Sequence, residues 1–419
     1  MFTNYIRVKI TSHLGKNILA VMFFIFLASS FHVEAAALWD VGKCKHSTYP
    51  FVIQTCTITT FNSNKLKIQG ESFTVELPGR PDVVISRRQL KADTKDDSIW
   101  VGTVGGRDDS SATFAVVNGR VFGDIVTSGG EIFRLRMDAK ENRFFLDELD
   151  QKKLPKGKEP HGSRRNEPPK TIDESYRLKK DDCVNNKSLD ILVLYTPAVL
   201  ATVGNDPDQV RSRIKVAVAE TETSYSLSGI PLTIDVKDVL QVQYTETGNV
   251  DDALVAVETD PNAKSMRKNA HADVVVLVTN DLGGGVANQL QRRHVGNLNF
   301  AESAYAVVSL ISFTGGYAFG HELGHLFGAQ HEIATYRGAF PFSKAFVHRQ
   351  PIQGCIQVGW GTMMSQLSNC SNCKVLQFWS DPSGLKCSVS LGGLHADRKN
   401  AETLRRTLDT VTSFGCNLK

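Results

Sequence analysis

Residues 320–331 read GHELGHLFGAQH, with three histidines at a fixed spacing. On a helix, His321 and His325 are four residues apart and project from one face, so both imidazoles can bind a single Zn²⁺ ion. Gly328 lets the backbone leave the helix in a conformation that is costly for other residues, and His331 can then return as a third ligand. Three protein ligands leave one metal position open, which is typical of catalytic rather than structural zinc sites.

Glu322 stands beside the first predicted ligand and can supply a base. From that place its carboxylate reaches the open position of the metal, where a water would sit. A carboxylate there can take the proton of a water whose pKa the metal has lowered. Chance is a poor explanation, because five fixed positions match by accident at about 10⁻⁴ over a chain of this length. The sequence therefore predicts a catalytic zinc centre.

A second motif, GTMMS at residues 361–365, follows the first. Together the two motifs resemble the signature of the metzincin zinc endopeptidases, HExxHxxGxxH followed by a methionine turn. The resemblance assigns Met364 to that turn, as a hydrophobic floor under the metal ligands, because Met363 falls on the family's isoleucine. It implies an α/β catalytic domain in which a twisted, mostly parallel sheet packs with helices and is divided by an active-site cleft.

Within the metzincins, the chain is most similar to reprolysin-like proteins and bacterial peptidyl-Asp metalloendopeptidases. Cys373 and the run FWSDP at residues 378–382 resemble their segment after the Met-turn, and SIWVG at residues 98–102 resembles their β-rich propeptide. Two features differ from relatives in the wider family. Glu332 follows the third ligand where reprolysins usually have Asp, and no tyrosine follows the turn methionine as it does in astacins and serralysins.

The resemblance also places one wall of the substrate pocket in the segment after the Met-turn. An acidic substrate residue there would need a cationic partner, because burying a lone carboxylate is costly, and Lys374 is the candidate. Neighbours along an extended chain point to opposite sides, so Lys374 can also face away from the pocket. The aliphatic and aromatic residues that follow it suit a hydrophobic pocket at least as well. We expect hydrophobic residues after the cut, with acidic residues as the alternative.

The composition fits a secreted globular protein. Charged residues make up 22% of the chain and the net charge is only +4, which is too balanced to indicate a nucleic-acid partner. Residues 1–37 have a basic start, an apolar run of about 14 residues and a small-residue end, which predicts a secretory signal peptide. A membrane anchor is the alternative, but it needs about 20 apolar residues. We therefore expect a secreted protein without a membrane span once the signal is removed.

Three segments follow the signal peptide. Residues 38–150 are rich in strand formers, with hairpin turns predicted at Asn118-Gly119 and Gly129-Gly130. Residues 151–187 are basic and contain prolines, which predicts an exposed linker with dibasic pairs open to processing. Residues 188–419 alternate strands and helices, which predicts an α/β fold. Asp206-Pro207 predicts the start of a helix, and the unbroken apolar run at residues 274–278 predicts a buried strand. By the resemblance, the β-rich segment is a propeptide that inhibits the peptidase until the linker is cut.

The eight cysteines form an even set, which indicates disulfides in a secreted chain. Cys44 and Cys56 are close enough in sequence to close a small loop, whereas the pairing of the other six stays open. Cys370 and Cys373 could bind a second zinc or act as a redox pair, but an oxidising compartment favours a disulfide. A propeptide thiol could also cover the zinc of the zymogen, and Cys183 is a better candidate for this than Cys44.

These features predict a secreted zinc endopeptidase that is made as a zymogen and acts on protein or peptide substrates. One alternative is a zinc-containing adhesion or binding protein without turnover, against which Glu322 argues. Another is a zinc amidase that acts on cell-wall peptides. The sequence does not fix the natural substrate or a calcium requirement.

Overall fold

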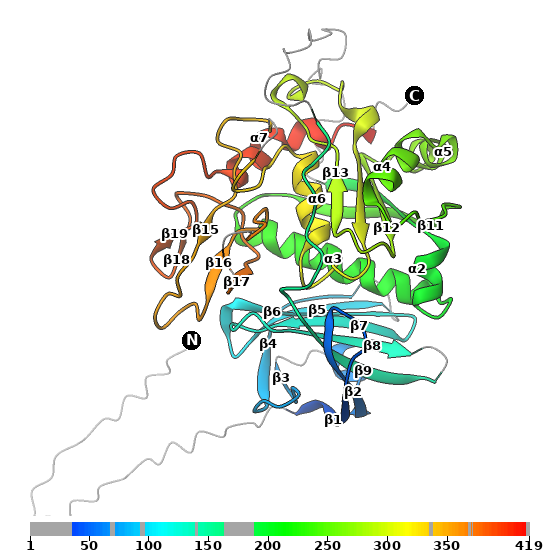
Figure 1. Ribbon diagram of the computed structural model, residues 1–419, viewed down its shortest axis with the longest axis vertical. Helices are drawn as coiled ribbons and strands as arrows, with labels where there is room; N and C mark the ends of the chain where they lie inside the picture. The colour runs from blue at the N-terminus through cyan, green and yellow to red at the C-terminus, as the bar shows by residue number, and fades with distance from the viewer. Residues whose placement is uncertain are drawn as a thin grey trace, which may run out of the picture. The chain divides into compact units, whose positions relative to one another are not determined.

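The computed structural model describes residues 36–67, 72–92, 97–138, 141–162, 188–334, 338–367, 370 and 372–415. Most of the predicted signal peptide lies outside these residues, as do Cys183 and the dibasic pairs between residues 163 and 187. The span Ala35–Lys419 is one compact unit. Its described residues form a β-barrel and a mixed sheet flanked by helices (Figure 1).

A closed barrel of nine strands forms the first half of the described chain (Figure 1, blue to teal). In order around the barrel, the strands are β1 (Ala37–His46), β2 (Val52–Phe61), β9 (Arg143–Leu149), β8 (Ile132–Asp138), β7 (Arg120–Val126), β6 (Arg107–Val117), β5 (Ser98–Val104), β4 (Val83–Ala92) and β3 (Ser72–Val75). The short helix α1 (Asn64–Lys67) lies between β2 and β3 in the chain. Neighbouring strands are antiparallel except β1 and β3, whose parallel pairing closes the barrel.

The two predicted hairpins connect β6 to β7 and β7 to β8, which are neighbours in the barrel. Asn118 and Gly119 both have positive φ, 46° and 79°, as a type I′ turn between β6 and β7 requires. Gly130, with φ of 90°, lies in the turn from β7 to β8. The sequence predicted these strands but not their closure, because closure depends on the pairing of Ala37 with Thr74, which are far apart in the chain.

A five-stranded sheet forms the core of the second half. Its strand order is β11 (Thr233–Gln241), β10 (Ser188–Tyr195), β12 (Val274–Thr279), β14 (Tyr305–Ser309) and β13 (Gly285–Ala287). The first four strands are parallel, and β13 runs antiparallel to them at the edge. All of β12 is buried, as its unbroken apolar run predicted. The predicted α/β class is therefore confirmed for this half, with a mixed sheet.

Helices cover both faces of the sheet. They are α2 (Pro197–Thr202), α3 (Pro207–Leu227), α4 (Val250–Thr259), α5 (Pro261–Ala270), α6 (Ala318–Leu326) and α7 (Asn400–Val411), with 3₁₀ turns η2 (Arg292–His294) and η3 (Ala301–Ser303). The side chain of Asp206 caps α3, as its Asp-Pro start predicted. Alternate residues of β10 point to the two faces. Ile191 and Val193 pack with α3 and α6, whereas Leu192 and Leu194 pack with α4 and α5.

Short strands and disulfides organise the chain after α6. The strands β15 (Val347–His348), β16 (Gly359–Gly361) and β17 (Cys373–Val375) form one small sheet, and β18 (Leu385–Lys386) pairs with β19 (Val389–Ser390). The disulfides among the described residues are Cys44–Cys56, Cys355–Cys387 and Cys370–Cys373. Cys370 and Cys373 therefore hold neither a second zinc nor free thiols, and Cys44 has no thiol with which to cover a metal. No helix in the described ranges is long and apolar enough to cross a membrane.

Candidate active site

The three predicted metal ligands come together in the structure. His321 and His325 project from α6, and His331 follows the turn after it. The Nε2 atoms of His321 and His331 are 2.9 Å apart, and those of His325 and His331 are 3.2 Å apart. Ligands that bind zinc tetrahedrally at 2.0–2.1 Å lie about 3.3 Å from one another. The spacing therefore fits one shared zinc ion.

Each histidine is oriented by a hydrogen bond from its other ring nitrogen. An imidazole that donates from Nδ1 keeps its Nε2 lone pair for a metal. Burial lowers the pKa of His321 to about 3 and also lowers that of His325, which keeps both rings neutral as metal ligands must be. The acceptors for Nδ1 of His321, His325 and His331 are Met363 O at 3.1 Å, Ala329 O at 3.1 Å and Glu159 Oε1 at 3.1 Å, respectively.

Two glycines permit this arrangement. Gly328 has φ of 87°, so the backbone leaves α6 as predicted. A Cβ on Gly324 would lie 2.5 Å from the sulfur of Met364 and 2.7 Å from the ring of Trp379. Only glycine therefore allows the turn methionine to pack this closely against α6. Met364 is completely buried there, and the preceding residue supplies the carbonyl that orients His321.

Glu322 is buried beside the histidines without a partner. It is 0% exposed, and neither of its carboxylate oxygens has a hydrogen bond to any described residue. Burial raises its pKa well above the usual value for a glutamate. An unpaired buried carboxylate destabilises the folded protein, so its presence indicates a functional role. Convergent imidazoles next to such a carboxylate fit a zinc centre with a base at its open position.

Residues 155–162, here called the covering segment, run along the edge of the sheet and over this site. An isolated parallel bridge pairs His161 with Asn288, just beyond β13. Three backbone hydrogen bonds hold the segment: Lys158 N to Gly285 O at 2.8 Å, His161 N to Ala287 O at 2.9 Å and Gln289 N to His161 O at 2.7 Å. The sequence predicted an exposed linker here, whereas in the structure these residues pair with the edge of the sheet through backbone hydrogen bonds.

Gly157 lies directly over the candidate catalytic residues. A Cβ on Gly157 would lie 2.5 Å from Glu322 Oε1 and 3.5 Å from His321 Nε2. The Gln366 side-chain amide donates to the carbonyl of Gly157 at 3.2 Å. Beneath the segment, His321 is only 8% exposed and His331 only 1%. The uncut chain therefore holds a formed site that its own N-terminal half covers.

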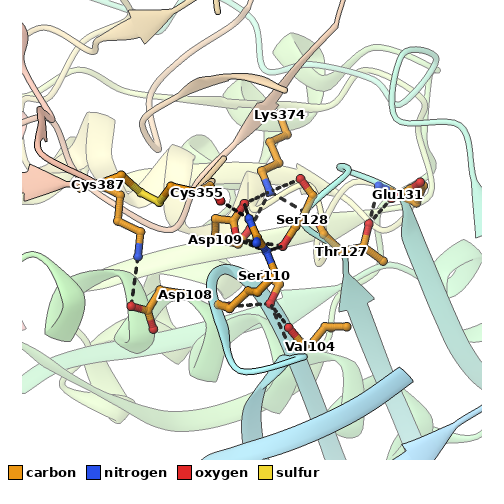
Figure 2. Close-up of polar contacts among 12 residues, drawn as sticks. Val104, Asp108, Asp109, Ser110, Thr127, Ser128, Glu131, Cys355, Lys374 and Cys387 are labelled. Atoms are coloured by element: carbon orange, nitrogen blue, oxygen red, sulfur yellow. Dashed lines mark hydrogen bonds and ion pairs between the residues drawn. A yellow bond between two sulfur atoms is a disulfide. The ribbon is translucent and has the colours of Figure 1, made fainter. Parts of the chain in front are cut away.

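Lys374 points toward the barrel. Its Nζ donates to Asp109 Oδ2 at 3.1 Å and to the carbonyls of Asp109 at 2.6 Å and Ser128 at 2.8 Å (Figure 2). Its neighbours on β17, Cys373 and Val375, line a cavity of about 870 Å³ beside His321. The alternation expected of a strand thus places Lys374 on the opposite side from the cavity.

Several residues around the site were missed by reasoning from the sequence. They are Gly157, Glu159, His161, Asp251 and Gln289, which orient a ligand, cover the site or bind the covering segment. None belongs to a motif, and the covering segment meets its partners only across long chain separations. The only feature of the sequence that marked the covering segment was its prolines between two predicted domains, and these indicated a linker.

Comparison with known proteins points to one kind of enzyme. Residues 185–379 match the reprolysin model of metallo-peptidase family M12. The peptidyl-Asp metalloendopeptidase of Stenotrophomonas maltophilia (strain K279a) is 27% identical over 332 residues, which cover 76% of this chain and 74% of that protein. Its namesake from Xanthomonas campestris pv. campestris is 26% identical over 356 residues, with 79% of each chain covered.

Two solved structures are also similar. Metalloproteinase-II from Bacteroides fragilis is 12% identical at a TM-score of 0.35, with 64% of this chain and 85% of that chain covered. A chaperone-substrate complex is 14% identical at a TM-score of 0.41, with 72% of this chain and 43% of that chain covered.

Proposed function

We propose that this chain, a reprolysin-like metallopeptidase of family M12, is a secreted zinc endopeptidase made as a zymogen. The observation that carries the proposal is the formed but covered site. Three histidines converge and an unpaired glutamate lies beside them, yet the covering segment lies over them, with Gly157 against Glu322 and Glu159 bound to His331. The predicted signal peptide and the disulfides support secretion.

Each side chain has a defined part in the proposed reaction. Zinc held by His321, His325 and His331 would polarise the scissile carbonyl and activate a water. Glu322 takes the proton of the attacking water and passes it to the leaving amine. Burial raises the pKa of Glu322, which favours the second step, because the carboxyl holds the proton until the amine takes it. The three acceptors of the Nδ1 protons keep the imidazole rings in place.

Latency in this proposal comes from the covering segment rather than from a cysteine. Gly157 and Glu159 lie over the site, and neither offers a thiol. Cys183, the candidate for a cysteine switch, lies outside the described residues. Cleavage between residues 163 and 187 would disconnect the covering segment from the peptidase and allow it to leave.

We propose hydrophobic residues after the cut. Cys373 and Val375 line the cavity beside His321, which suits an apolar side chain. An acidic residue is the second candidate, because Lys374 already binds a carboxylate, that of Asp109 in the barrel. The bacterial relatives carry the name of peptidyl-Asp bonds. Cut sites mapped in a peptide pool separate the two: dominant cuts before Asp, lost in Lys374→Ala, would favour the second.

The deciding experiment compares uncut chain, chain cut between residues 163 and 187, and the cut Glu322→Gln variant on casein. The cut wild type should cleave casein and stop when the metal is chelated. Glu322→Gln should keep zinc and lose about 10²–10⁴-fold in rate, the usual contribution of a general base. His325→Ala should lose the zinc itself, because two imidazoles hold it poorly.

Four results would each reject the proposal or one part of it. A Glu322→Gln rate within tenfold of wild type would exclude Glu322 as the base. Equal activity of uncut and cut chain would exclude the zymogen. Zinc without any peptide cleavage would leave the adhesion protein, and cleavage of cell-wall peptides but not casein would leave the amidase.

A further inference from the structure

The covering segment presents two different faces to the peptidase. Gly157 and Glu159 face the zinc site, where they contact Glu322 and His331, respectively. Lys158 and His161 instead reach Asp251, at the beginning of α4. Alternate residues of an extended chain point to opposite sides, which accounts for Lys158 lying opposite Gly157 and Glu159. His161, three residues after Lys158, also reaches Asp251, although strict alternation would place it with Gly157 and Glu159. The rim formed by the start of α4 is therefore the second surface that a bound strand meets.

Asp251 binds two basic side chains of the covering segment. Lys158 Nζ lies 2.6 Å from its Oδ2, and His161 Nε2 lies 3.0 Å from its Oδ1. Asn249, which caps α4, adds its side-chain oxygen to Lys158 Nζ at 2.8 Å. Burial alone would raise the pKa of Asp251, but Lys158 and His161 bring it below the usual value. The rim thus offers three oxygens to cations and stays negatively charged.

The covering segment occupies the edge of the sheet where a substrate strand could bind, so Asp251 could contact a substrate as well as this segment. The backbone groups that hold it are Gly285 O, Ala287 O and the N–H of Gln289, all at the open edge of the sheet beside the histidines. Once the segment leaves, these groups are free to hold a substrate strand in the same place. Whichever way the substrate runs, every second side chain faces the start of α4.

Resting on the proposed function, we propose that Asp251, with the side-chain oxygen of Asn249, forms a subsite for a basic side chain of the substrate. Lys158 and His161 fill this subsite in the uncut chain. Lys158 and His161 are one and four residues along from Gly157, which lies over Glu322, so the basic residue falls within four positions of the cut. An acidic residue at that position is disfavoured, because it would face Asp251. Asp251 is thus a specificity-determining residue of the peptidase.

The test uses the full chain cut between residues 163 and 187, as wild type and as Asp251→Asn. Asp251→Asn is nearly isosteric and leaves the N-cap of α4 in place. A peptide pool first gives the sequence around the cut. Paired peptides that carry lysine or norleucine at the enriched position are then compared by kcat/KM. Asp252→Asn is the matched control, because Asp252 is the next residue of α4, is exposed and pairs with Thr247.

We expect wild type to prefer lysine over norleucine by about twofold to fivefold, the range for a partly exposed ion pair. Asp251→Asn should remove this preference by slowing cleavage of the lysine peptide alone, and Asp252→Asn should keep it. A wild type without enrichment of basic residues, or an Asp251→Asn variant with the wild-type ratio, overturns the inference and leaves the endopeptidase proposal intact. Failure of the cut wild type to cleave any peptide overturns both.

Discussion

The N-terminal half contacts the peptidase half through two regions that differ in kind. The covering segment is held by backbone hydrogen bonds and by the pair of Lys158 with Asp251, whose side chains are 40% and 34% exposed. The barrel is held by buried charges: the side chains of Lys374 and Asp109 are 1% and 2% exposed. Exposed ion pairs contribute at most about 1 kcal/mol, whereas breaking a buried pair costs about 3–5 kcal/mol.

A second buried pair extends the barrel contact toward the zinc helix. Arg134 of β8 binds both oxygens of Asp124, at 2.9 and 3.1 Å, and donates to the carbonyls of Ile311 and Thr314. These two carbonyls lie in the loop that leads into α6, which carries His321 and His325 of the candidate metal site. The barrel therefore contacts the framework of the site, while the covering segment lies over the site itself. The two regions should respond differently to mutation.

Asp109→Asn should give the largest effect, which is a loss of stability against unfolding. It leaves the Lys374 ammonium buried without a countercharge, so at pH 5, where this lysine holds its proton, the free energy of unfolding of the uncut chain should fall by about 3 kcal/mol. Denaturant unfolding measures this. Latency should persist, because the contacts of the covering segment are untouched. Asp108→Asn is the control: its side chain is 63% exposed, and the change should stay within about 0.5 kcal/mol. Equal losses in both variants would contradict a buried anchor.

Gly157→Val should instead weaken latency and leave the contacts of the barrel unchanged, and its effect in free energy should be smaller. Its Cβ would meet Glu322 Oε1 at 2.5 Å, so the covering segment must move away from the site. Overpacking of about 1–3 kcal/mol shifts the equilibrium for opening of the segment by about 5- to 150-fold, and activity of the uncut chain on a small peptide should rise accordingly. The activity of the uncut Gly157→Ala variant should rise less, because alanine adds only the Cβ. A Gly157→Val chain as latent as wild type would show that the barrel, not the covering segment, closes the site.

The same contrast explains what could be predicted from the sequence. The zinc ligands and Glu322 lie within twelve residues, and helical periodicity alone brings His321 and His325 together. The hairpin at Asn118-Gly119 and the start of α3 at Asp206 also depend on adjacent residues, and both were correct. Such local features are fixed by backbone preferences that the sequence displays directly.

Contacts between distant segments could not be predicted in this way. Gly157 meets Glu322, and Lys374 meets Asp109, only after the barrel has closed and packed on the peptidase. A glycine in a polar stretch indicates flexibility unless its neighbours in space are known. The alternation rule did allow that Lys374 could point away from the pocket, but it could not show which carboxylate would receive the ammonium.

The smallest expected effect concerns the pH dependence of the barrel contact. Burial lowers the pKa of Lys374 to about 8, and Asp109 opposes this shift only in part. Arg107 lowers the pKa further, and Glu131 raises it. An unfolded lysine titrates near 10.4, so between pH 8 and that value the unfolded chain binds the additional proton. Stability then rises with pH, because the folded state no longer has to bury a charge.

Lys374→Met removes this titration while it keeps most of the side-chain volume. The free energy of unfolding of wild type relative to Lys374→Met should therefore increase by roughly 2 kcal/mol between pH 8 and pH 10, whereas the difference should change little between pH 6 and pH 7. Urea unfolding of both uncut chains at each pH, with disulfides intact, measures it, and groups common to both chains cancel. A difference that stays flat or falls above pH 8 would mean that the ammonium is as well solvated at the barrel contact as in water. The barrel would then be held no more firmly than the covering segment, and the contrast between the two regions would fail at its strongest point.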